Sequence, residues 1–243
     1  MKLEIYNTKK EASYVAAKKA VEILNSAIKS KGHANIVAAT GTSQFEFLKN
    51  VIKDKSIDWS KVTLFHLDEY IGLPEKHKAS FRRYLRKRLI NKIHLGEVHL
   101  IKSTSKDPKE EIKLLNKEIS KKEIDIAFLG VGENGHLAFN DPPADFKTAK
   151  PFIIVKLDEV NRKQQLKEGW FSKLSDVPKQ AISMSIKQIM KSENIICLVF
   201  GKRKSEIVKE CFTKRISPMC PSSILKNHKK AFVYLDKKSA LLL

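Results

Sequence analysis

The polar residues best suited to catalysis lie in a glycine-rich loop at residues 130–141, directly after an apolar run typical of a buried strand. Gly132 and its neighbouring glycines allow the backbone to approach a ligand closely. His136 follows, together with two side chains, Asn134 and Asp141, that can orient an imidazole ring. A histidine held in one tautomer can act as an acid or a base. The loop therefore predicts an acid–base site, and the alternative is a structural loop that happens to contain a histidine.

A second candidate for acid–base chemistry follows the apolar run at residues 61–67. Asp68 and Glu69 come directly after this run, and neighbouring side chains of an extended chain point to opposite faces. Only one of the two carboxylates can therefore face a crevice at the end of the strand. We assign the catalytic position to Asp68 and place Glu69 among the residues that bind substrate.

The turn Thr40-Gly41-Thr42-Ser43 joins an apolar run at residues 35–39 to a helical pattern. A strand, a turn rich in glycine and hydroxyl groups, and a helix amino end together form a natural receiver for an anion. An ordinary helix cap is the alternative explanation.

A second anion-binding candidate follows the apolar run at residues 194–200. Lys202, Arg203 and Lys204 come at the start of the next predicted helix, where cations oppose the helix dipole. A bound anion would reverse this unfavourable interaction. Solvated lysines in a lysine-rich chain are the alternative.

These candidate residues follow apolar runs that alternate with helical patterns along the chain. Strands are expected at residues 35–39, 61–67, 97–101, 126–130, 151–157, 194–200 and 231–235, and helices at 8–31, 79–92, 107–121 and 222–226. Residues 158–178 form an irregular excursion or lid, and residues 181–190 a strand that turns into a short helix. Such alternation predicts a three-layer α/β fold, a mostly parallel Rossmann-like sheet with helices on both faces. We expect a single domain over residues 1–243, without repeats or linkers.

Composition limits the classes of function. The net charge of +20 suggests nucleic-acid binding, but the basic residues are spread over nearly every helix and no nucleic-acid-binding motif is present. The densest basic segment, residues 81–92, has apolar residues at helical spacing, which favours a solvated helix face over an anion-binding surface. We therefore expect no nucleic-acid partner.

The cysteines and the amino-terminal sequence indicate where the chain functions. Cys197, Cys211 and Cys220 show no C-x-x-C spacing, so neither a disulfide framework nor a zinc site is predicted. Cys197 lies in an apolar run and is expected to be buried. The chain contains neither a long apolar segment nor the apolar core of a signal peptide at its start, which predicts a cytoplasmic protein without a membrane partner.

Several segments in a fixed order resemble the glucosamine-6-phosphate deaminase (isomerase) family, which is related to the 6-phosphogluconolactonases. The resemblance covers nearly the whole chain, through ATGTS, LFHLDEYIGLP, FLGVGENGHLAFNDPP, VPKQAISMSI, GKRKSE and PSSILKNH. The LAFNDPP and LDEYIGLP segments are similar to the deaminase branch. The lactonase branch shares the G-x-G-x-x-G-H core but continues with a serine-containing stretch.

The resemblance implies a function for each candidate. Asp68 would move a proton between C2 and C1 of the opened amino sugar, and His136 would assist ring opening. The Thr40–Ser43 turn and Lys204 would hold the phosphate. The product of proton transfer is an iminium that water hydrolyses, which gives ammonia and fructose 6-phosphate. No metal or cofactor is needed, and the partner is a phosphorylated amino sugar.

The chain departs from the family pattern at three positions. The family usually has aspartate where this chain has Asn134 and glutamate where it has Asp141. Ring opening could be slower, Asp141 could replace the missing carboxylate, or the substrate could be another amino or keto sugar phosphate. If Asn134 limits ring opening, Asn134→Asp should raise the rate. An arginine that many deaminases use has no clear counterpart, and Arg162 and Lys167 are the candidates.

Two other functions stay open. One is a hydrolase of the 6-phosphogluconolactonase type, in which His136 activates water. The other is a sugar-phosphate sensor that binds without turnover, which the neutral Asn134 would suit. The sequence leaves the oligomeric state, including a homo-oligomer, undecided.

Overall fold

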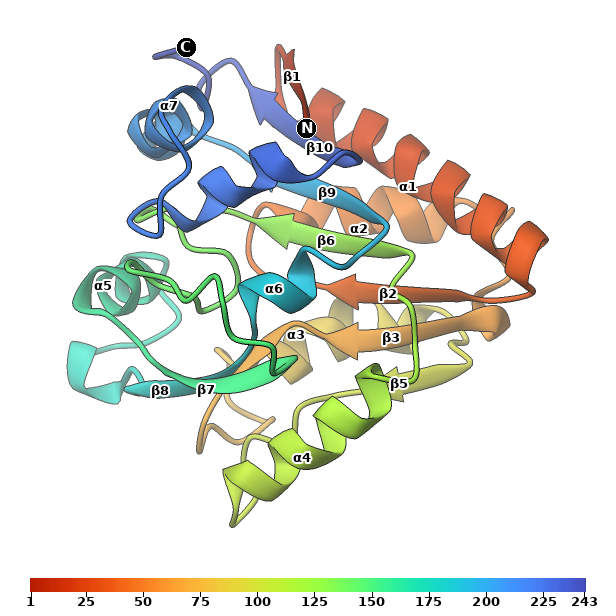
Figure 1. Ribbon diagram of the computed structural model, residues 1–243, viewed down its shortest axis with the longest axis horizontal. Coiled ribbons are helices and arrows are strands. Elements are labelled where there is room, and N and C mark those ends of the chain that lie inside the picture. The colour runs from red at the N-terminus through yellow and green to blue at the C-terminus, as the bar shows by residue number, and fades with distance from the viewer.

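A computed structural model describes residues 1–243, and its centre is a sheet of seven parallel strands (Figure 1). The strand order is β1 (Lys2–Tyr6), β10 (Ala231–Asp236), β9 (Asn194–Val199), β6 (Ile126–Gly130), β2 (Ala34–Ala38), β3 (Val62–His66) and β5 (Glu97–His99). The two central strands β2 and β6 are neighbours, with Val37 opposite Ala127. All residues of β2, β3 and β9 are buried, as expected for strands that are covered on both faces.

Helices cover both faces of this sheet and form two apolar cores. One core contains α1 (Lys9–Lys31), α2 (Gln44–Lys53) and α3 (Phe81–Arg88). The other contains α4 (Pro108–Ile119), α6 (Ile186–Ile189) and α7 (Ser205–Thr213). Side chains of one strand alternate between the two cores, since Ile36 belongs to the first and Val37 to the second. The predicted three-layer fold is therefore confirmed.

The longest helix, α1, begins and ends where the sequence predicts. The Thr8 hydroxyl accepts a hydrogen bond from the Glu11 N–H at 3.1 Å, which satisfies a free donor of the first turn. Gly32 adopts φ 77° after the last turn, a left-handed conformation that glycine tolerates.

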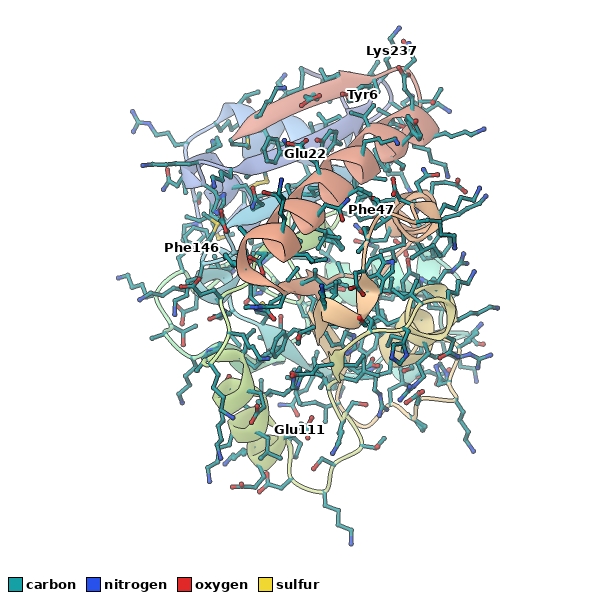
Figure 2. The ribbon with its side chains drawn as sticks, turned by 90° about the vertical axis from the view of Figure 1, so that its right-hand side faces the viewer. Tyr6, Glu22, Phe47, Glu111, Phe146 and Lys237 are labelled. Carbon is teal, nitrogen blue, oxygen red and sulfur yellow. A yellow bond between two sulfur atoms is a disulfide. The ribbon has the colours of Figure 1, made fainter.

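Side chains on α2 show how the helices pack on the sheet. Phe47 points inward from α2 (Figure 2), and its ring meets that of Phe128 edge-on at 4.9 Å between centroids. Charged side chains such as Glu22 and Lys237 lie on the outside (Figure 2). Side chains that end in nitrogen project from many sides of the molecule in this view, in agreement with the spread of basic residues along the chain.

A second, antiparallel sheet lies beyond the carboxyl end of β3. It pairs β4 (Asp68–Tyr70) with β8 (Gln180–Met184) and β8 with β7 (Phe152–Lys156). An apolar cluster around Tyr70 and Phe171 packs there, next to α5 (Glu159–Lys167). The strand that turns into a short helix at residues 181–190 is confirmed as β8 followed by α6.

Some sequence expectations need correction. Strand β1 was not predicted, because its alternating pattern is short and only half buried. The excursion at residues 158–178 was expected to be irregular but contains α5, which begins at an Asp158 cap whose carboxylate accepts the Asn161 N–H.

The cysteine expectation also needs correction. Cys211 and Cys220 form a disulfide with 5.6 Å between their Cα atoms. Their separation of nine residues carries no spacing signal, since a helix end and a loop bring them together. Cys197 is buried as predicted, and burial raises the pKa of its thiol to about 12.

Candidate active site

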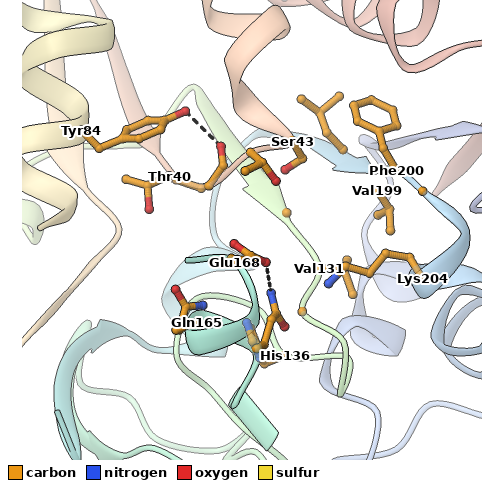
Figure 3. Close-up of a pocket in the computed structure, with 18 of the residues that line it drawn as sticks. Thr40, Ser43, Tyr84, Val131, His136, Gln165, Glu168, Val199, Phe200 and Lys204 are labelled. Atoms are coloured by element: carbon orange, nitrogen blue, oxygen red, sulfur yellow. Dashed lines mark hydrogen bonds between the residues drawn. The ribbon is translucent and has the colours of Figure 1, made fainter. Parts of the chain in front are cut away.

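A cavity of about 530 Å³ opens at the carboxyl ends of the central strands. Segments that follow β2, β3, β6 and β9 all line it, and so does α5, the helix that follows β7 (Figure 3). Crevices at this edge of an open α/β sheet are the usual location of ligand sites. The cavity contains residues from each of the predicted chemical segments, namely Thr40, Gly41, Thr42, Ser43, Asp68, Gly132, His136 and Lys204.

The turn after β2 presents groups suited to an anion. Gly41 has φ 99°, a backbone conformation that would be strained in a residue with a side chain. Ser43 is the residue before the first turn of α2, and its hydroxyl makes no capping hydrogen bond. The Tyr84 hydroxyl of α3 donates a hydrogen bond to the Gly41 carbonyl at 3.1 Å (Figure 3). The Ser43 hydroxyl is therefore available to a ligand, whereas the Gln44 and Phe45 N–H groups donate to the Gly41 and Thr42 carbonyls.

Lys204 points into the cavity from the start of α7 (Figure 3). Burial lowers the pKa of its ammonium group to about 8, although the carboxylates of Glu133 and Glu168 oppose this shift. A partly desolvated cation in the same cavity as the Thr40–Ser43 turn is a suitable receptor for a phosphate group.

The two neighbouring carboxylates have different environments. Asp68 lines the cavity, and burial, with a smaller effect of the Glu69 charge, raises its pKa well above the ordinary value of 3.8. Glu69 instead accepts hydrogen bonds from the Ser80 hydroxyl and the Arg82 N–H, each at 2.9 Å, at the amino end of α3. Glu69 therefore anchors α3 and does not line the cavity, whereas Asp68 is placed to exchange protons with a ligand.

The His136 ring is oriented by the residues behind it. Its Nδ1 lies 2.6 Å from Asn134 Oδ1 and 3.2 Å from Asp141 Oδ1. The Asn134 amide nitrogen donates to Asp141 Oδ1 at 3.0 Å and to Asp158 Oδ2 at 2.9 Å. This fixes the amide, so that its oxygen accepts the proton of Nδ1. The neutral ring therefore has its lone pair on Nε2, the nitrogen that can meet a ligand.

Asp141 is the main carboxylate partner of this histidine. Burial alone would raise its pKa, but hydrogen bonds from His136 and Asn134 hold the pKa below its ordinary value. A second oxygen accepts the Asp158 N–H at 2.9 Å. Asp141 is thus a negative partner that can stabilise a protonated imidazole.

The His136 ring lies so close to the backbone of Gly132 that this position must be glycine. A Cβ atom at this residue would overlap the His136 ring, so only glycine fits. The Gly132 N–H donates to the His136 carbonyl at 3.1 Å, which closes the loop upon itself. The glycine therefore positions the histidine in addition to lining the cavity.

Among the other predicted residues, Arg162 lies away from the cavity. Its guanidinium donates to the Leu174 and Val177 carbonyls and holds the segment after α5. Lys167 also does not line the cavity, and neither do Asn134 and Asp141, which lie behind His136.

Sequence reasoning missed several residues that line the cavity, namely Lys78, Tyr84, Gln164, Gln165, Glu168 and Trp170. Most belong to α5 and the segment after it, a stretch without an apolar pattern or a glycine signature. The polar character of Gln164 and Gln165 was the one signal available.

No group of three or more His, Cys, Asp or Glu side chains is arranged to hold a metal ion. No helix has both the length and the apolar character required to cross a bilayer.

The fold and the cavity define a class: a three-layer α/β protein whose cavity, at the carboxyl ends of parallel strands, contains a carboxylate, an imidazole, a lysine and a turn rich in hydroxyl groups. Comparison with known proteins is more specific. The family model of the glucosamine-6-phosphate isomerases/6-phosphogluconolactonase matches residues 7–234. The chain therefore belongs to this family of enzymes.

Individual relatives of known name support the same family assignment. A glucosamine-6-phosphate deaminase of Streptococcus uberis is 36% identical over 211 residues, which are 86% of this chain and 87% of that protein. A glucosamine-6-phosphate deaminase of Bacillus cereus is 32% identical over 221 residues, covering 91% and 82%.

Solved structures show the same fold. A monomeric glucosamine-6-phosphate deaminase superposes with a TM-score of 0.90 at 28% identity and full coverage of both chains. A 6-phosphogluconolactonase of Shewanella baltica superposes with a TM-score of 0.80 at 19% identity, covering 97% of each chain. At that identity the second likeness concerns the fold alone.

Proposed function

We propose that this enzyme converts glucosamine 6-phosphate and water into fructose 6-phosphate and ammonia. The observation that carries the proposal is one cavity that contains Asp68, His136, the Thr40–Ser43 turn and Lys204. Relatives at 32–36% identity that bear the name glucosamine-6-phosphate deaminase support the same assignment.

The first step is ring opening. His136 Nε2 accepts the proton of the C1 hydroxyl and delivers a proton to the ring oxygen, which releases the C1 aldehyde. Asp141 and Asn134 stabilise the ring while Nε2 is protonated, because both accept from Nδ1. The hydrogen on C2 becomes acidic only in this open form, where a carbonyl is adjacent.

Asp68 then carries out the isomerisation. Its carboxylate removes the C2 proton, which leaves an enolamine, and returns a proton to C1, which leaves an iminium at C2. The buried position raises the pKa of this carboxylate and makes it a stronger base than an exposed one. Water adds to the C2 iminium, and ammonia leaves as the ketone forms. The Thr40–Ser43 turn and Lys204 hold the phosphate throughout.

Purified enzyme incubated with glucosamine 6-phosphate should release ammonia and fructose 6-phosphate in equal amounts. A parallel assay with 6-phosphogluconolactone should show a much lower rate. Binding of the amino sugar with no product after long incubation would instead indicate a sensor, and faster hydrolysis of the lactone would overturn the proposal.

A further inference from the structure

Carboxylates line the cavity at Asp68, Glu168 and Asp236. Asp236 is buried, and its Oδ1 accepts the N–H groups of Gly201 and Ser239 at 2.9 and 2.8 Å, which ties this carboxylate to the fold. Asp68 is the proposed base, and burial favours its neutral form. The carboxylate without an assigned function in the cavity is therefore Glu168.

Glu168 is held in place by its neighbours. Its Oε1 accepts from Gln164 Nε2 at 2.9 Å (Figure 3), and its Oε2 accepts from Trp170 Nε1 at 3.1 Å. Gln164 in turn accepts the N–H of Glu133 at 2.9 Å, which connects Glu168 to the glycine-rich loop. A carboxylate has about four acceptor positions, so two hydrogen bonds leave capacity for a ligand donor.

Glu168 contributes a negative charge to the cavity, and this charge raises the pKa of Lys204. Glu168 follows the last turn of α5, where the helix dipole disfavours an anion. It also shares the cavity with the Thr40–Ser43 turn and Lys204, which suit a phosphate. A ligand that carries only a phosphate is repelled by Glu168, whereas a ligand that also carries a cation is attracted.

We infer that Glu168 binds the ammonium group of the substrate and selects phosphorylated amino sugars over uncharged sugar phosphates of the same size. This inference rests on the proposed function, since it assigns the group that reads the amine of that substrate. The phosphate site and Glu168 then recognise opposite charges at two places on one small molecule. A phosphorylated lactone offers only one of these charges.

The test compares two unreactive ligands by calorimetry: the alcohol obtained by reduction of glucosamine 6-phosphate, and glucitol 6-phosphate, which has a hydroxyl instead of the amine. The wild-type enzyme should bind the amine-containing ligand about tenfold more tightly, as expected for one charge-assisted hydrogen bond. Glu168→Gln should lose this preference, through weaker binding of the amine and equal or tighter binding of glucitol 6-phosphate.

Glu133→Gln is the matched control. Glu133 also raises the pKa of Lys204 but does not line the cavity, so this variant should change the affinity for both ligands alike and keep their ratio. An unchanged ratio in Glu168→Gln would overturn the inference. Because neither ligand reacts, this result is independent of ammonia release, whose absence in wild-type enzyme would overturn the proposed function instead.

Discussion

Asn134 Oδ1 lies 2.6 Å from Nδ1 of His136, and the amide of the same residue donates to two carboxylates. Those carboxylates belong to Asp141 and Asp158. An amide side chain can accept from an imidazole while it donates to two anions, whereas a carboxylate can only accept. The neutral residue at this position is therefore matched to its surroundings, and Asp141 supplies the negative charge near the ring.

This arrangement reverses the expectation for Asn134→Asp. The substitution would place a carboxylate about 3 Å from two others, and like charges at such distances destabilise one another. We expect kcat to fall about tenfold or more and the melting temperature to decrease, as measured by ammonia release and by thermal unfolding.

The compensating control exchanges the two side-chain types. Asn134→Asp combined with Asp158→Asn removes one of the two carboxylates next to residue 134 and keeps a residue that can cap α5. The double variant should recover part of the lost stability, because the contact with Asp141 remains. A rise in rate in the single variant would show that the neutral Asn134 limits ring opening.

Asp68→Asn should abolish turnover, by about a thousandfold or more, because an amide cannot remove the C2 proton. Binding of glucitol 6-phosphate should change little, since Asp68 acts in proton transfer. Steady-state assays and calorimetry measure the two effects separately. A parallel loss of ligand affinity would show that Asp68 is a binding residue.

The raised pKa of Asp68 also predicts a pH dependence. The base form exists only above this pKa, so the acid limb of kcat/KM should lie above the ordinary carboxyl value of 3.8. The folded pKa exceeds the unfolded one, so wild-type stability decreases as pH rises through the folded pKa. Asp68→Asn should therefore be more stable than wild type at neutral pH. Its stability should increase less than that of wild type as the pH is lowered, as thermal unfolding at several pH values would show.

The sequence predicts the main sheet well because its strands are continuous apolar runs that end in turn residues. The run at residues 126–130 and the following glycines are unambiguous, since only a buried strand and a tight loop fit both. The chemical segments follow these strands directly. Once the strands are parallel, their carboxyl ends meet at one edge, and the cavity forms there.

The remaining parts depend on contacts between distant residues. Gln164 and Trp170 hold the Glu168 carboxylate in the cavity through hydrogen bonds. The sequence of α5 has no periodic pattern that predicts these contacts. Glu69 was assigned to substrate binding, but it anchors the amino end of α3 through Ser80 and Arg82, contacts 11 and 13 residues away. Local spacing does not encode such partners.

Lys204 predicts an alkaline limit for ligand binding. With a pKa of about 8, its ammonium group is charged below that pH and loses its proton above it, so the affinity for glucitol 6-phosphate should fall as pH rises past 8. Lys204→Arg keeps its charge and should bind without this alkaline loss if the guanidinium fits. Lys202→Gln removes an exposed cation at the same helix start and should keep the wild-type pH dependence. An alkaline loss that survives in Lys204→Arg would assign the effect to another group.

Alanine substitutions at Gly132 and Gly130 are expected to change different kinetic constants. A Cβ at Gly132 overlaps the His136 ring, so Gly132→Ala must move the imidazole away from its hydrogen bond with Asn134. The expected result is a fall in kcat of about a hundredfold, because a misplaced acid–base group loses most of its contribution.

A Cβ at Gly130 instead approaches the Ser43 hydroxyl at 3.2 Å, in the turn proposed to bind the phosphate. Gly130→Ala should therefore raise KM several-fold with a smaller change in kcat. Steady-state kinetics of both variants, with circular dichroism to verify folding, separates the two cases. If Gly132→Ala raised KM and left kcat unchanged, the His136 ring would contribute to binding and not to ring opening, because only a group that acts in the transition state lowers kcat when it is displaced.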